Sequence, residues 1–242
     1  MSKIISGVSD AMRKVLPLKY CAAVIVAAGN ASRMGGIDKV MAPLKGEPMI
    51  VHTVRTFQNT DAVREIVIVT RPDLIVSISD LCHDFDKVTA VIVGGNSRQE
   101  SVQRGLAALS GKAKLVAVQD GARPLISRQV IDRTVRAAHT YGAAAPVIPV
   151  KDTIKEANGG IVVSTPDRSR LFAVQTPQVF DLALLRGALQ KAARENAELT
   201  DDCSAVERMG MSVKLVEGEE RNLKVTTPFD LKIAELWMEE TI

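Results

Sequence analysis

The stretch CAAVIVAAGNASRMGGIDK (residues 21–39) joins a continuous apolar run to a loop of small residues that ends at a lysine. An apolar run without polar alternation is typical of a strand buried on both faces of a parallel sheet. The small residues after it let backbone N–H groups approach an anion closely, and Arg33 and Lys39 supply two cations for it. The loop fits neither a dinucleotide fingerprint, because Ala31 stands at the second glycine, nor a P-loop, because no Gly-Lys-Ser/Thr follows. The stretch predicts an α/β sheet whose first strand ends in a phosphate-binding loop.

Short β-branched runs alternate with helix-like stretches along the rest of the chain. The expected strands are residues 22–27, 65–70, 89–93, 115–119 and 143–149. The expected helices are residues 48–58, 72–82, 98–109, 128–141 and 229–238. This order predicts a mainly parallel sheet with helices on both faces, and such folds bind ligands at the carboxyl ends of their strands.

The pattern changes after the fifth expected strand, where charged and small residues surround Asn158-Gly159-Gly160, a good hairpin turn. We expect a protruding β-arm over about residues 151–166. The length of 242 residues is most simply one domain, residues 1–242. Residues 1–18 form an N-terminal extension without the continuous apolar segment of a signal peptide.

Composition excludes several classes of protein. Aromatic residues make up only 3% of the chain and the formal charge is +3, which argues against a nucleic-acid partner. No apolar run is long enough to span a bilayer. The three cysteines are odd in number and widely spaced, which suits reduced thiols in a cytoplasm and gives no zinc signature.

Two further loops follow expected strands. Asp120, in the stretch QDGARP (residues 119–124), is a carboxylate at a strand end that could bind Mg²⁺, and Arg123 could reach a substrate phosphate. In GGNSRQES (residues 94–101), Asn96 and Ser101 suit the edge of a nucleobase. Each loop alone is also compatible with an ordinary turn, a surface ion pair or a capped helix start. Three such loops after strands of one sheet are a more specific signal than any one of them.

Six motifs occur in order: the Ala-Ala-Gly loop with its Arg-Met and Lys, Asp-Gly-Ala-Arg-Pro from 120, Lys-Asp-Thr-Ile-Lys from 151, Gln-Thr-Pro-Gln from 175, Leu-Thr-Asp-Asp from 199, and Glu-Gly…Asn-Leu-Lys-Val-Thr from 217. Together they resemble the 2-C-methyl-D-erythritol 4-phosphate cytidylyltransferases of the non-mevalonate isoprenoid pathway, over nearly the whole chain. The resemblance implies a nucleotidyltransferase-type α/β fold. It also implies transfer of CMP from CTP to a polyol phosphate, with Mg²⁺ as cofactor.

The resemblance also assigns roles to individual positions. Arg33 and Lys39 match the positions that stabilise the transition state. Asp120 matches the position that binds the metal. Arg168 and Lys224 match the positions that hold methylerythritol phosphate for attack. The positions that match the cytidine and phosphate pocket are Ala27, Ala28, Gly29, Gly95, Asn96 and Ser101. Those around methylerythritol phosphate are Arg123, Thr153, Thr176 and Thr200. A homodimer formed through the β-arm is implied, in which Arg168 of one chain serves the pocket with Asp120, Thr153 and Lys224 of the other.

Three other functions stay open on the sequence. A ribitol 5-phosphate cytidylyltransferase is the nearest, although residues 151–155 and 167–171 look more like the methylerythritol enzyme. A non-catalytic nucleotide-binding protein is disfavoured, because Arg33, Lys39 and Asp120 are all present. A dinucleotide oxidoreductase would need the glycine fingerprint and an acidic residue at the end of the second strand, where Thr-Arg-Pro stands instead.

Overall fold

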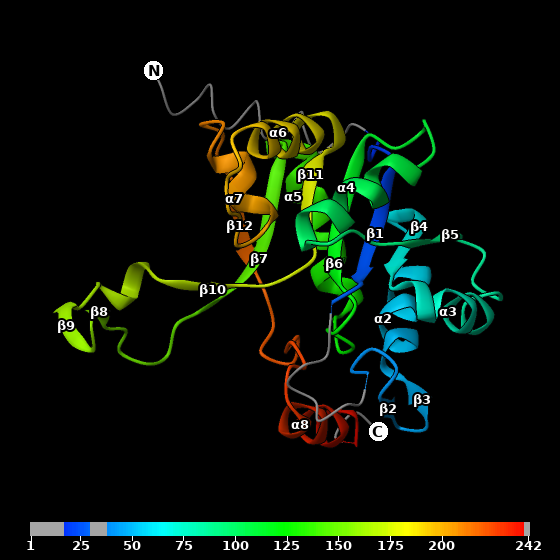
Figure 1. Cartoon of the computed structure of the whole chain (residues 1–242), viewed down its shortest axis with the longest axis horizontal. Coiled ribbons are helices and arrows are strands. Elements are labelled where there is room, and N and C mark those ends of the chain that lie inside the picture. Colours follow the sequence, from blue (N-terminus) through cyan, green and yellow to red (C-terminus); the bar gives the residue numbers. More distant parts are fainter. Residues whose placement is uncertain (1–16, 30–37, 240–242) are drawn as a thin grey trace.

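The computed structural model describes residues 17–29 and 38–239, which form a central sheet covered by helices (Figure 1). The strand order is β10-β7-β11-β6-β1-β4-β5, with β12 paired to β7. Their bounds are β1 (Cys21–Ala27), β4 (Val63–Thr70), β5 (Val88–Val93), β6 (Leu115–Asp120), β7 (Ala143–Pro149), β10 (Phe172–Val174), β11 (Gln178–Asp181) and β12 (Lys214–Glu217). The pairs among β6, β1, β4 and β5 and the pair β7–β12 are parallel, whereas β11 and β10 run antiparallel to their neighbours. The predicted mainly parallel α/β sheet is confirmed.

Helices cover both faces of this sheet. They are α2 (Met49–Gln58), α3 (Ile75–Leu81), α4 (Arg98–Ala108), α5 (Arg128–Tyr141), α6 (Leu182–Arg194), α7 (Asp202–Glu207) and α8 (Pro228–Glu239), with short 3₁₀ turns η1 (Pro72–Leu74) and η2 (Arg168–Arg170). Successive side chains of β1 enter different cores: Ile25 packs with residues of α2 and α5, and Val24 with residues of α4 and α6. The apolar run reads as continuous because both of its faces are buried. Within the described residues, every helix is too short or too polar to cross a membrane.

The expected elements match the observed ones to within a few residues, with two differences. The helix expected over 72–82 is divided into η1 and α3. The elements β10, β11, α6, α7 and β12 were not predicted. The three strands among them have only three or four residues and carry too little alternation to identify. The short pair β2 (Pro43–Leu44) and β3 (Glu47–Pro48) was also missed.

The predicted β-arm is present. It is the hairpin of β8 (Glu156–Asn158) and β9 (Ile161–Ser164), which extends away from the sheet beyond β7 and β10 (Figure 1). The two turn residues Gly159 and Gly160 have φ of +55° and +80°, as a type I′ turn requires. Ile161, Val162 and Val163 are exposed, Ile161 to 75%. In one chain the arm therefore presents apolar side chains to solvent.

Two glycines in helices give a matched test of the packing. A Cβ at Gly105 of α4 would lie 2.4 Å from Val24 Cγ1 of β1, whereas a Cβ at Gly187 of α6 meets nothing within 4 Å. We expect Gly105→Ala to lower the free energy of unfolding by about 1–3 kcal/mol through overpacking. Gly187→Ala should raise it by about 0.5–1 kcal/mol through helix propensity. Urea unfolding measures both, and equal effects would contradict the close approach of α4 to β1.

Candidate active site

A cleft of about 420 Å³ opens at the carboxyl ends of β1, β4, β5 and β6. The sheet register brings these ends together, since Ala27 pairs with Thr70, Thr70 with Val93, and Val26 with Asp120. The sequence-predicted residues that line the cleft are Ala27, Ala28, Gly29, Lys39, Gly95, Asn96, Ser101, Asp120 and Lys224. Arg33 lies outside the described residues. The three loops singled out from the sequence thus meet in one place.

The loop after β5 is braced from inside. Ser101 Oγ accepts a hydrogen bond from Gly95 N at 3.0 Å and donates one to Ser97 O at 2.9 Å. Ser97 caps α4 by accepting from Glu100 N, while the Glu100 carboxylate accepts from Asn96 N at 2.8 Å. The side chains of Ser97 and Glu100 therefore accept hydrogen bonds from two different backbone N–H groups, those of Glu100 and Asn96. It leaves the exposed Asn96 side chain at the cleft.

Asp120 ends β6 and is surrounded by cations. Its Oδ2 lies 2.8 Å from Lys224 Nζ, Arg98 Nε lies 3.7 Å from its Oδ1, and Arg123 Nε lies 3.8 Å from its Oδ2. The carboxylate is 12% exposed. Burial acts to raise the pKa of Asp120, but these cations outweigh it and hold the pKa below the ordinary value of 3.8. The group is therefore an anion at neutral pH.

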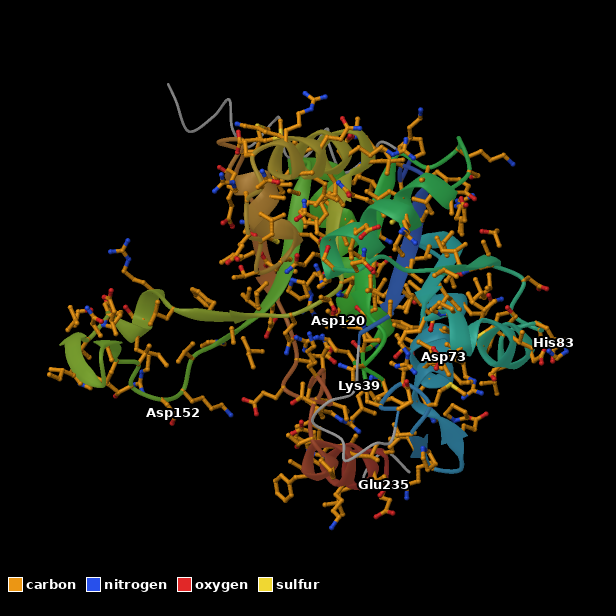
Figure 2. All side chains as sticks on the ribbon, viewed as in Figure 1. Lys39, Asp73, His83, Asp120, Asp152 and Glu235 are labelled. Atoms are coloured by element: carbon orange, nitrogen blue, oxygen red, sulfur yellow. The ribbon has the colours of Figure 1, made fainter. Side chains whose placement is uncertain are left out.

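The backbone fixes the two partners of this ion pair. Asp120 N donates to Thr176 Oγ1 at 3.1 Å, and Val225 N donates to Ala122 O at 2.9 Å. The second bond places Lys224, which precedes Val225, beside the end of β6. Figure 2 shows Asp120 near the centre of the molecule, with Lys39 close to it in that view.

Two cleft arginines were missed by the sequence analysis. Arg98 donates from Nη2 to Asp202 Oδ2 at 2.7 Å, and burial raises the pKa of Asp202 although Arg98 opposes the shift. Arg71, directly after β4, pairs with Asp73 and Asp38. Both arginines line the cleft. The available signal was a position near a strand end: Arg71 follows β4 directly, and Arg98 begins the helix after the loop that follows β5.

Other predicted residues do not line the cleft. Arg123 is buried and donates from Nη1 to Asn222 O at 2.5 Å, and Thr176 is buried beneath Asp120. Thr200 is exposed. Arg168 donates to Lys151 O at 2.5 Å at the base of the arm. Asp152, the neighbour of Thr153 in the chain, lies on the arm side, away from Asp120 (Figure 2).

The cleft fits a hard cation that is shared with a phosphate ligand. No group of three or more His, Cys, Asp or Glu side chains that could hold a metal occurs among residues 17–29 and 38–239. Mg²⁺ does not need such a cage, because it is commonly held by one or two carboxylates together with substrate phosphates and water. The ionised carboxylate of Asp120 faces the cleft and meets that requirement.

Comparison with known proteins gives a consistent family. Residues 21–240 match the family model of 2-C-methyl-D-erythritol 4-phosphate cytidylyltransferase. Proteins of that name from Caldanaerobacter subterraneus and Geobacillus kaustophilus are 41% and 45% identical, over 89% and 88% of this chain and 97% and 94% of theirs. The structure of 4-diphosphocytidyl-2C-methyl-D-erythritol synthase from Anaerococcus prevotii is 31% identical with a TM-score of 0.83, covering 91% of this chain and 96% of that one.

A second solved structure agrees with the first. The 2-C-methyl-D-erythritol 4-phosphate cytidylyltransferase of Thermus thermophilus is 34% identical with a TM-score of 0.75, covering 91% of this chain and 99% of that one. The residues that match the family model include the sheet, the cleft loops and the arm, and the other matches extend over nearly the full length of each relative. This chain belongs to the 2-C-methyl-D-erythritol 4-phosphate cytidylyltransferase family.

Proposed function

We propose that this protein transfers CMP from CTP to 2-C-methyl-D-erythritol 4-phosphate. A phosphate oxygen of the acceptor attacks the α-phosphorus of CTP, the bond from that phosphorus to the bridging oxygen of pyrophosphate breaks, and 4-diphosphocytidyl-2-C-methyl-D-erythritol forms. The observation that carries the proposal is the cleft itself, in which Asp120, Lys39 and Lys224 meet small-residue loops at one sheet edge. Joining two anions requires positioning and cationic stabilisation and no protein nucleophile.

The residues divide by location. The backbone of the loop at Ala27, Ala28 and Gly29 approaches the triphosphate, while Lys39, together with Arg33, stabilises the charge that develops on the α-phosphate. Gly95, Asn96 and Ser101 form the cytidine side of the cleft. The methylerythritol phosphate is positioned by Lys224, Arg123, Thr176 and Thr200 and by Arg168 and Thr153 on an arm.

Asp120 is the residue that would hold Mg²⁺. The ion would neutralise phosphate charge and orient the triphosphate. Lys224 Nζ contacts Asp120 Oδ2 at 2.8 Å, which places its ammonium group at the cleft, where it would bind the acceptor phosphate. Arg98 is tied to Asp202 and keeps the other side of Asp120 electropositive.

Pyrophosphate release with CTP and a panel of polyol phosphates tests the proposed reaction. We expect turnover with 2-C-methyl-D-erythritol 4-phosphate to exceed that with ribitol 5-phosphate by at least about 10²-fold, since sites that hydrogen-bond their substrate reject mismatched hydroxyls strongly. Preference for ribitol 5-phosphate would establish the alternative reaction. Binding of CTP without turnover of any acceptor would indicate a non-catalytic protein.

The arm supports a homodimer. An isolated two-stranded hairpin is marginal in water, and the arm exposes Ile161, Val162 and Val163. Packing against the arm of a second copy would bury these side chains. Because Arg168 and Thr153 lie with the arm and outside the cleft of their own chain, we propose that both reach the cleft of the partner.

Complementation between two inactive variants tests this composite site. Arg168→Ala and Asp120→Asn homodimers should each be nearly inactive. In a mixed dimer one cleft receives both defects and the other receives neither, so activity should recover to about half of wild type per heterodimer. The control variant is Arg170→Ala, because Arg170 also lies in η2. Its homodimer should be active without complementation. Absence of recovery in a verified heterodimer would place Arg168 in the site of its own chain.

We also propose that the chain is one cytidylyltransferase domain, residues 1–242, with residues 1–18 as an extension, and that it works in the cytoplasm. Cys21, Cys82 and Cys203 are buried and unbridged. Burial raises the pKa of the Cys82 thiol to about 11, so that thiol is unreactive at neutral pH. Three buried, reduced thiols suit a reducing compartment.

A further inference from the structure

Arg71 is a cleft residue for which neither the family resemblance nor the proposed reaction provides a role. It follows β4 directly, and the last pair of the β1–β4 register joins Thr70 to Ala27, where the phosphate loop begins. Its side chain reaches the other end of that loop, because Nη1 forms an ion pair with Asp38 Oδ2. Arg71 thus connects the sheet edge at the start of the loop with the residue just before Lys39.

Asp38 uses its second oxygen to hold the backbone after Lys39. Oδ1 accepts a hydrogen bond from Val40 N at 3.0 Å, and Met41 N donates to Asp38 O at 3.2 Å. Val40 itself is buried in the core and its carbonyl accepts from Ile50 N at 2.9 Å. Lys39 therefore lies between two anchored residues, and one of the anchors depends on Arg71.

Asp38 places a negative charge beside a cleft that is proposed to bind phosphate. The Asp38 side chain is only 17% exposed, and a carboxylate left there without a cation would be both poorly solvated and repulsive toward a triphosphate. Arg71 neutralises it. The guanidinium has a fork geometry that contacts two carboxylates at once: Nε and Nη2 donate to Asp73 at 3.1 and 2.9 Å while Nη1 faces Asp38.

We propose that the Arg71–Asp38 ion pair is a positioning device that holds Lys39 in place for the α-phosphate of CTP. It acts through the turn that contains Lys39 and also keeps the negative charge of Asp38 masked. The inference rests on the proposed function for the identity of the phosphate, but the anchoring of the turn does not depend on that function.

The kinetic test uses full-length Asp38→Asn, Arg71→Met and the double variant, with Asp73→Asn as the matched control. We expect kcat for pyrophosphate release to fall about tenfold or more in each single variant, since small displacements of a catalytic group are costly. Arg71→Met should also raise the KM for CTP, because Asp38 is then unmasked. The kcat and KM of the double variant should resemble those of Asp38→Asn, without the additional rise in KM for CTP seen in Arg71→Met. This is the result expected for two residues that act through one contact. Asp73 is 62% exposed and is absent from the described residues that line the cleft, so Asp73→Asn should stay within about twofold of wild type.

Hydrogen exchange provides a readout that is independent of turnover. Exchange in a peptide containing residues 38–42 should be faster in Arg71→Met and Asp38→Asn than in wild type, and unchanged in Asp73→Asn, since Val40 N–H loses an anchored acceptor. Unchanged exchange, or variants whose kcat stays within twofold of an active wild type, would overturn the inference. A kcat loss that equals the unfolded fraction at the assay temperature would also overturn it. A wild-type protein that is inactive with CTP and every acceptor would overturn the proposed function, and hydrogen exchange would still decide the anchoring.

Discussion

Asp120→Asn is expected to reduce kcat for pyrophosphate release by at least about 10²-fold while the protein stays folded. The substitution preserves shape but removes the one negative charge that Lys224, Arg98 and Arg123 surround. It also removes the carboxylate that would hold Mg²⁺ beside the triphosphate. Raising the Mg²⁺ concentration should recover part of the activity, because the phosphates still bind the ion.

The measurement is a Mg²⁺ titration of kcat for wild type and variant at saturating CTP and acceptor. Asp132→Asn is the control, since Asp132 forms an exposed ion pair with Arg136 on α5 and such pairs contribute little. The control should match wild type. If Asp120→Asn had the same activity and Mg²⁺ dependence as wild type, Asp120 would be a turn residue only.

Lys39→Ala is expected to lower kcat by about 10²–10³-fold, with a much smaller change in CTP binding. Lys39 lines the cleft, and its charge matters most when negative charge develops on the non-bridging oxygens. An interaction stronger in the transition state than in the ground state lowers kcat more than it weakens binding. The same result is expected for Arg33→Ala, on the basis of the sequence alone.

Steady-state kinetics and direct CTP titration together measure this split. Lys45→Ala is the matched control, because Lys45 pairs with Glu239 at the surface and lies outside the cleft. Its activity should equal that of wild type. A Lys39→Ala enzyme that turns over normally at saturating substrates would remove Lys39 from the catalytic step, and a loss confined to CTP affinity would make it a ground-state binding residue.

Local patterns in the sequence were sufficient to predict the strands and the loops that form the site. The run at 21–27 is apolar at every position because Ile25 and Val24 enter different cores, and that pattern can be read without a structure. The small residues after β1 and Asp120 after β6 follow directly from strand ends, which parallel strands bring to one edge of the sheet. Asn158-Gly159-Gly160 likewise predicts the hairpin, since only residues that accept positive φ form its turn.

Contacts between distant segments required the tertiary structure. Arg98 meets Asp202, 104 positions away, because β11 inserts antiparallel between β6 and β7 and brings α7 to the cleft. Arg71 meets Asp38 because β4 lies beside β1.

The sequence alone thus determined a parallel α/β sheet with a phosphate loop and an acidic residue at its edge. Only the tertiary structure decided which charges pair there and that Arg123 turns inward. The physical reason is that the periodicity of apolar residues depends on which residues are buried and can be read locally. Ion pairs depend on the strand order, which brings distant residues together, and on the free-energy cost of burying a charged group without a partner.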